Sequence, residues 1–180
     1  MKRLFVLAAA LGLGACASLT EEQCLNGDWS GIGYQDGLRG YPQSRIGDHR
    51  EACAKVGVSP DIQAWLAGRA EGLKRYCTPE NAYVVGRNGN ELNPVCPASQ
   101  AQSLNAANAW GLEYHELELE IAELQAEISV IQDRLINEFT GVLTPEQEAE
   151  RNALLREVRI LERQIDLLEL RQRRYTQLPL

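Results

Sequence analysis

The chain has 180 residues, a formal net charge of −7, and 24% charged residues. Nucleic acids and anionic lipid headgroups bind basic surfaces, so the acidic balance argues against both as direct ligands. The length allows one compact domain with an appendage.

The N-terminus has the features of a secretory signal peptide. Lys2 and Arg3 are followed by ten residues without a charge, from Leu4 to Leu13, and then by small residues. Ten residues rise only about 15 Å as a helix, roughly half of a bilayer core, so this segment is too short to span a membrane. We therefore predict a signal peptide over residues 1–15.

The end of this segment, Leu13-Gly14-Ala15-Cys16, is similar to a lipobox. In lipobox proteins the cysteine is lipidated and becomes the first residue of the mature chain. We therefore predict a lipidated tether over residues 16–23 and a location in the cell envelope. Ala17 stands where aspartate would signal inner-membrane retention, so the resemblance implies the outer membrane, facing the periplasm, if the source is Gram-negative. The alternative is an ordinary signal peptide followed by a chance cysteine.

Four cysteines remain beyond the lipobox: Cys24, Cys53, Cys77 and Cys96. An even number in an exported chain with a small core implies two disulfides. A zinc site is the alternative, but the cysteines have no C-x-x-C spacing, and His49 and His115 are the only histidines. We therefore predict structural disulfides, and neither a metal site nor a cofactor.

The region between the cysteines contains an internal repeat with the pattern G-x-x-acid-G-L-base-x-Y. The two copies begin at Gly33 and Gly68, each with a tryptophan upstream, Trp29 and Trp65. A fixed offset of this kind suggests two related helical units. Glycine costs about 1 kcal/mol at each helix-interior site, so its presence requires a reason. Close approach of another backbone is the favoured reason, and a ligand pressed against the helix is the alternative.

We expect the helices of this region to run up, down and up again. The signature Ser59-Pro60-Asp61, with Ser59 as the cap, predicts the start of the third helix, and the second is expected over residues 45–56. A short extended arm with a glycine turn is expected over residues 83–90. The helix order predicts two disulfides, Cys24–Cys53 and Cys77–Cys96.

The order of cysteines and glycines over residues 20–96 is similar to that of a family of uncharacterised bacterial envelope lipoproteins. Beside the cysteines, the residues that carry the resemblance include Asp28-Trp29, Asp36-Gly37, Gly72-Leu73 and Tyr76-Cys77. The resemblance implies a lipid anchor and disulfides. It implies no activity.

The C-terminal half contains two heptad seams with an alternating spacing of three and four residues. The apolar seam residues are Leu117, Ile121, Leu124, Ile128, Ile131 and Leu135, then Leu154, Val158, Leu161, Ile165 and Leu168. Gly141 and Thr144-Pro145 predict a helix stop and a new start between the seams, and so short a connection makes the helices antiparallel. A capping box is expected at Ser99 and Gln102.

The predicted fold is therefore all-α. It has a small disulfide-stapled helical domain over residues 24–96, with a short extended segment, followed by an antiparallel coiled-coil hairpin over residues 99–177.

The chain lacks the common catalytic motifs, including G-x-S-x-G, H-E-x-x-H and a phosphate-binding loop. His49 with Asp48 or Glu51 resembles acid–base machinery, and Asp36 with Glu71 resembles the carboxylate pair of a glycan hydrolase. Because such residues are common on helix surfaces, we expect a non-enzymatic structural or protein-interaction lipoprotein.

The hairpin is the expected partner surface, with another envelope protein or a second copy of the chain as partner. The alternative is a purely structural role, in which the hairpin only packs on the disulfide domain. A second candidate surface on the glycine-rich helices comprises Asp36, Arg39, Glu71 and Lys74. A small-ligand or glycan binder would instead use the aromatic residues Trp29, Tyr34, Trp65 and Tyr76.

Changing Cys16 to Ser tests the anchor. Without a thiol the chain cannot be lipidated, so the variant is expected to leave the detergent phase in a phase-partition experiment, whereas the unmodified chain stays in it. Cys24 and Cys53 changed together to Ser provide the control, because this variant keeps Cys16. Unchanged partitioning of the Cys16→Ser chain would contradict lipidation at this position.

Overall fold

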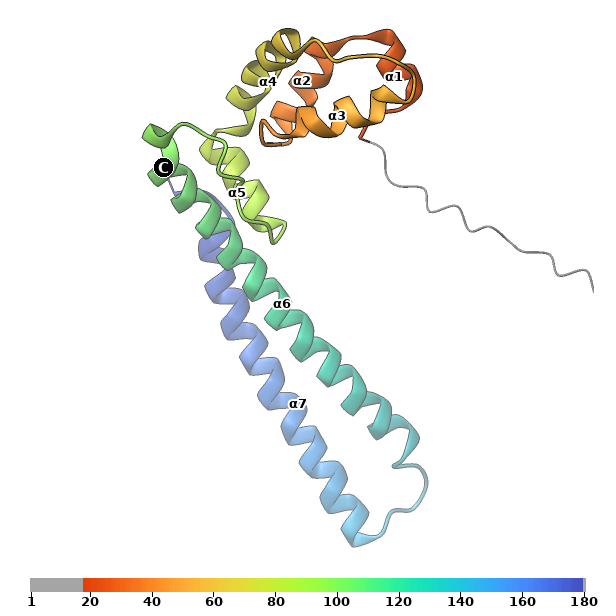
Figure 1. Cartoon of the computed structure of the whole chain (residues 1–180). Helices are drawn as coiled ribbons and strands as arrows, with labels where there is room; N and C mark the ends of the chain where they lie inside the picture. Colours follow the sequence, from red (N-terminus) through yellow and green to blue (C-terminus); the bar gives the residue numbers. More distant parts are fainter. Residues whose placement is uncertain (1–17, 180) are drawn as a thin grey trace, which may run out of the picture. The chain divides into compact units, whose positions relative to one another are not determined.

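The computed structural model describes residues 18–179, and all regular elements within them are helices, including two short 3₁₀ turns (Figure 1). The predicted signal peptide and Cys16 lie outside the described residues. The chain divides into two compact units, the first ending at Leu73 and the second beginning at Lys74. The predicted all-α fold is confirmed.

The first unit contains short helices with well-defined caps. They are α1 (Glu21–Asn26), α2 (Trp29–Leu38), α3 (Arg45–Ala54) and most of α4 (Ile62–Tyr76). Thr20 forms a capping box at α1, and the Asp28 carboxylate accepts a bond from the N–H of Gly31 at the start of α2. At α4 the cap is Asp61, whose carboxylate accepts the N–H groups of Gln63 and Ala64, each at 3.0 Å. The predicted cap at Ser59 is therefore wrong, because the aspartate lies two residues closer to the free N–H groups.

The two copies of the glycine repeat form one helix–helix contact. A Cβ on Gly33 would collide with the backbone at Trp65, and a Cβ on Gly68 would collide with the backbone of Ser30. One turn further along, a Cβ on either Gly37 or Gly72 would lie 2.9 Å from the Cα of the other. The backbones of α2 and α4 thus touch directly, which confirms packing as the reason for these glycines.

The core of this unit surrounds a disulfide. Cys24 and Cys53 are bonded and almost fully buried, and they pack with Leu19, Trp29 and Trp65. The bond joins α1 to α3 and closes a loop that, on the chain-entropy model, contributes about 3–4 kcal/mol. It is one of the two bonds that the up-down-up helix order predicts.

The second unit contains the long helices and the second disulfide. Its elements are α5 (Pro79–Arg87), the 3₁₀ turn η1 (Ala98–Gln100), α6 (Ala101–Asn137), α7 (Pro145–Gln172) and the 3₁₀ turn η2 (Arg173–Tyr175). The expected extended arm over residues 83–90 is wrong, since residues 83–87 are helical. Thr78 caps α5 and Pro79 occupies its first turn, and these local signals outweigh the strand preference of the adjacent valines. The irregular segment lies over residues 88–97 instead.

Glycines also mediate the contact between α5 and α6. A Cβ on Gly86 would collide with the backbone of Asn108, and a Cβ on Gly111 would collide with that of Tyr83. The Cys77–Cys96 disulfide lies in the same unit. The predicted division at residues 96–99 therefore differs from the structure, where close packing joins α5 to the base of the hairpin.

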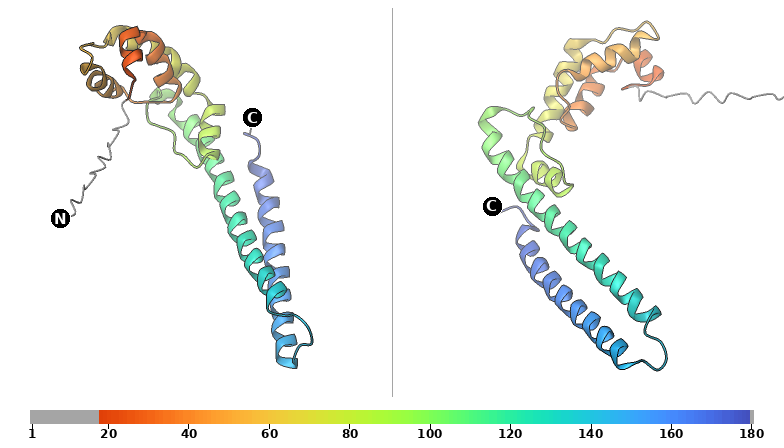
Figure 2. Two further views of the ribbon diagram at one scale, coloured as in Figure 1. Left: turned by 90° about the vertical axis from the view of Figure 1, so that its right-hand side faces the viewer. Right: turned by 60° about the horizontal axis from the view of Figure 1, so that its bottom comes forward.

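Helices α6 and α7 lie side by side and antiparallel in both views of Figure 2. Their core contains the predicted seam residues, among them Ile121, Ile128, Leu154 and Val158. Thr144 and Gln147 form the capping box of α7. The capping box predicted at Ser99 is wrong, because this residue lies in η1 and α6 begins without a side-chain cap.

Polar bonds hold the returning helix at the base of the hairpin. Arg171 pairs with Glu113 at 3.1 Å, and the Tyr83 hydroxyl donates to the backbone carbonyl of Tyr175. The Tyr175 ring also packs on the Trp110 ring, with 4.5 Å between the ring centroids. Within residues 18–179 no helix combines the length and the hydropathy that crossing a bilayer requires.

Replacing Gly72 by Ala is expected to destabilise the first unit by about 2 kcal/mol or more, because the added methyl must push two backbones apart. Gly47→Ala in α3 is the matched control, since nothing lies within 4 Å of the position its Cβ would occupy. The control is expected to be neutral or stabilising by about 0.5–1 kcal/mol. Urea unfolding followed by tryptophan fluorescence measures both effects. Equal stability of the two variants would contradict the backbone contact.

Candidate functional site

A buried chain of polar side chains crosses the first unit. The Asp36 carboxylate lies on α2 and accepts two bonds at Oδ2, from Nε2 of His49 at 2.7 Å and from Nε1 of Trp65 at 2.8 Å. Nδ1 of His49 lies 2.8 Å from the Ser18 hydroxyl. Asp36, His49 and Trp65 are at most 5% exposed, so these bonds are shielded from water.

The chemistry of the partners fixes the direction of the bonds. A carboxylate only accepts hydrogen bonds, and an indole N–H only donates. The bond to Asp36 therefore places a proton on Nε2 of His49, and in the neutral ring Nδ1 is left to accept the proton of the Ser18 hydroxyl. Each donor in the chain thus meets an acceptor, which a buried network requires to be stabilising. The order serine, histidine, aspartate also occurs in acyl-transfer enzymes, where it activates the serine.

A cavity of about 400 Å³ lies beside this network in the first unit. Asp36, His49 and Ser18 contribute to its wall, together with two arginines, Arg39 and Arg45. The Arg45 guanidinium is already engaged, because it pairs with Asp48 at 3.0 Å and lies 4.6 Å from the centre of the Tyr41 ring.

The structure brings together different residues from those that sequence patterns suggested. His49 bonds Asp36 rather than Asp48 or Glu51, and Asp36 is buried while Glu71 is exposed. Both suggested catalytic pairs are therefore wrong. Residues close in sequence project from different faces of a short helix, whereas the contact between α2 and α3 depends on how the unit folds. No local signal could have identified the pair.

The candidate surface on the glycine-rich helices is only partly a surface. Arg39, Glu71 and Lys74 are exposed, but Asp36 belongs to the buried network. Burial lowers the pKa of the neighbouring Arg69 guanidinium from its ordinary value, and the negative charge of Asp36 opposes this shift. Arg69 donates from Nε to the backbone carbonyl of Tyr41 at 2.8 Å, so it also serves the packing of the unit.

The aromatic residues considered for glycan binding are mostly core residues. Trp29 and Trp65 are 6% and 0% exposed, and Tyr76 is 5% exposed, whereas Tyr34 is 37% exposed. Tyr34 lines a shallow groove of about 510 Å³ with Gly68 and neighbouring residues of α2 and α4. One accessible ring offers little of the stacking surface that carbohydrate recognition uses.

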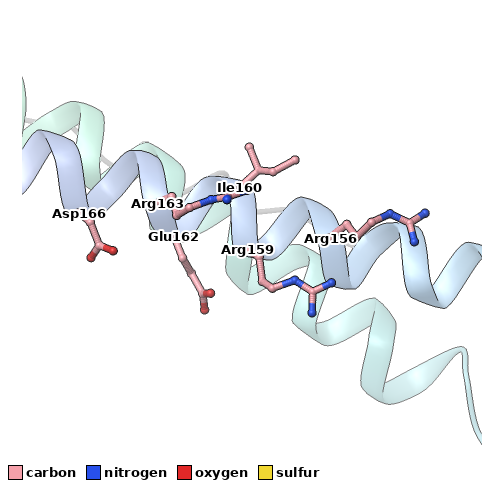
Figure 3. Close-up of a pocket in the computed structure, with 6 residues that line it drawn as sticks. All are labelled: Arg156, Arg159, Ile160, Glu162, Arg163 and Asp166. Atoms are coloured by element: carbon pink, nitrogen blue, oxygen red, sulfur yellow. The ribbon is translucent and has the colours of Figure 1, made fainter.

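The hairpin exposes large apolar side chains away from its core. On α6 these are Leu119 and Val130, 53% and 62% exposed, and on α7 they are Ile160, Leu167 and Leu170, 49–68% exposed. A groove of about 380 Å³ runs beside Ile160 and is lined entirely by residues of α7, as Figure 3 shows. Its walls are Arg156, Arg159, Ile160, Glu162, Arg163 and Asp166.

Comparison with known proteins finds one family model that matches part of this chain. Residues 28–113 match the family described as "Protein of unknown function (DUF2799)". This stretch is similar to an uncharacterised family. The DUF2799 stretch includes Asp36, His49 and Trp65 as well as Gly86 and Gly111, and it ends before the first seam residue of the hairpin, Leu117. No curated protein and no solved structure matches the chain.

In the described part of the chain, no group of three or more His, Cys, Asp or Glu side chains is placed to hold a metal ion. The four cysteines considered as zinc ligands are all in disulfides.

Replacing Asp36 by Leu is expected to destabilise the first unit by about 3 kcal/mol, because the N–H groups of His49 and Trp65 then lie buried without an acceptor. Asp36→Asn keeps one oxygen for both donors and is expected to cost only about 1 kcal/mol. Asp48→Asn on the exposed face of α3 is the control. Equal losses from the Leu and Asn variants in thermal or urea unfolding would contradict the assigned network.

Proposed function

We propose that this chain is a lipid-anchored protein of the cell envelope that acts by binding a protein partner through its hairpin, without catalysis. The observation that carries the proposal is the row of large apolar side chains on the outer faces of α6 and α7. Val130 on α6 and Leu167 on α7 are 62% and 68% exposed, although the hairpin core is filled by other residues. Large apolar side chains that stay exposed among charged residues are a feature of binding surfaces.

The lipobox-like sequence at Cys16 and the disulfides support the proposed location in the cell envelope. Disulfides persist in oxidising compartments, which an exported chain reaches. If Cys16 carries the lipid, Ala17 alone separates it from Ser18, whose hydroxyl bonds His49. Two extended residues span at most about 7 Å, so the first unit would be held close to the membrane surface. In this reading the bond from Ser18 to His49 fastens the tether to the folded unit.

The buried network supports a structural role better than a catalytic one. His49 is 1% exposed and bonded through both ring nitrogens, and Asp36 is bonded to Trp65 as well. An acyl-transfer site also needs donors aimed at the developing oxyanion. At this cavity the N–H of Gly31 already bonds Asp28, and Arg45 pairs with Asp48.

A shortened hairpin tests the interaction role. Deleting residues 117–137 and 145–165 removes three heptads from each helix, and it leaves the α5–α6 contact and the Tyr83–Tyr175 bond in place. This variant is expected to form both disulfides and to lose its protein crosslinks in living cells. Crosslinked partners are identified by mass spectrometry. The full hairpin with Arg39→Ala and Glu71→Ala is the matched control and is expected to keep the crosslinks. A shortened chain that retains them all would contradict the hairpin as the partner surface.

A further inference from the structure

The outer face of α7 combines one apolar residue with a set of arginines. Ile160 follows the buried seam residue Val158 by two positions, which places it about 200° around the helix and therefore away from the hairpin core. Arg156 lies four residues before Ile160 and Arg163 three residues after it, so both are on the same face. Figure 3 shows the side chains of this groove projecting from α7. Arg156, Arg159 and Arg163 form no ion pair within residues 18–179.

The outer face of α6 has the opposite charge and the same layout in reverse order along the chain. Leu119 is exposed two positions after the buried seam residue Leu117. Glu116 lies three residues before Leu119 and Glu123 four residues after it, and both are exposed. An apolar residue flanked by acids on α6 thus corresponds to an apolar residue flanked by arginines on α7.

The two layouts are complementary when the helices are antiparallel. The residue three positions before one apolar centre then faces the residue three positions after the other. In the same way, the residue four positions after the first centre faces the residue four positions before the second. Over residues 116–130 of α6, a single register, in which the residue numbers of every pair add up to 279, makes three oppositely charged pairs and three apolar layers. The charged pairs are Glu116–Arg163, Glu120–Arg159 and Glu123–Arg156, and the apolar layers are Leu119–Ile160, Ala126–Ala153 and Val130–Ala149.

This contact cannot form within one chain. The same residues of α6 and α7 lie opposite the shared seam, with Leu117 and Val158 buried between the helices. The complementary surface must therefore come from another molecule. Along α6 the outer face becomes free after His115, because α5 and the turn at Gly89 cover it up to that point.

We propose that a second copy of this chain binds through α7 on α6, in this antiparallel register. The proposal rests on the proposed function of the hairpin as the partner surface and names the partner. Charge complementarity selects the second copy, because each chain carries both halves of the contact. The two halves lie on opposite faces of the hairpin, so copies add to one another head to tail. The layers from residue 116 to residue 130 extend along about 21 Å of helix, which is enough for a coiled-coil contact of two heptads.

Charge reversal in the full chain, purified in detergent with its disulfides intact, tests the register. Sedimentation analysis of the unchanged chain is expected to show self-association that grows with concentration, from a dimer to larger species. In the Arg156→Glu, Arg163→Glu variant, like charges face each other, and the dissociation constant is expected to rise about tenfold or more. Adding Glu116→Arg and Glu123→Arg restores opposite charges in both pairs and is expected to return the constant to within about threefold of the original. Arg151→Glu with Arg173→Glu is the control, because it changes the net charge equally but alters none of the six pairs.

Three outcomes overturn the proposal. A chain that is monomeric at all concentrations excludes the second copy. If reversing Arg156 and Arg163 leaves the dissociation constant unchanged, another surface is used. The same conclusion follows if the compensating changes at Glu116 and Glu123 fail to restore the constant. Far-ultraviolet circular dichroism and melting confirm that each variant is folded. A monomeric chain that still crosslinks to another protein through the hairpin in cells would leave the proposed function intact and refute only this inference.

Discussion

Both units of this protein depend on the direct contact of helix backbones at glycine. In the first unit Gly37 and Gly72 meet, and in the second Gly86 and Gly111 meet, with no room for a methyl group at any of the four. Short helices bury little apolar surface, so their stability depends on how closely they approach. Each glycine also weakens its own helix, and the disulfide in each unit offsets part of that cost by restricting the unfolded chain.

The close approach of α2 and α4 has a chemical consequence. It places the indole nitrogen of Trp65 2.8 Å from Oδ2 of Asp36, and His49 donates a second hydrogen bond to the same oxygen. A buried carboxylate is costly unless donors surround it, and here an indole and an imidazole supply them. The network in turn reaches Ser18, so the start of the described chain is bonded to the centre of the first unit.

The hairpin is built differently, because each of its two helices has an outer face that the shared core does not use. The seam buries Ile121, Ile128 and Leu161 between α6 and α7, and this core is complete without the outer faces. The acidic outer face of α6 and the basic outer face of α7 are therefore free for contacts between molecules. The hairpin can fold from its seam and still present Leu119 and Ile160 to a partner.

The sequence by itself determined the features that depend on near neighbours along the chain. The heptad seams, the turn capped by Thr144 and the glycine repeat are periodic or local signals, and the structure contains each of them. Only the tertiary structure decided that Asp36 bonds His49 and Trp65, and that α5 packs closely on α6. These features depend on contacts between residues distant in sequence, whose free energies outweigh local propensity and leave no periodic trace in the chain.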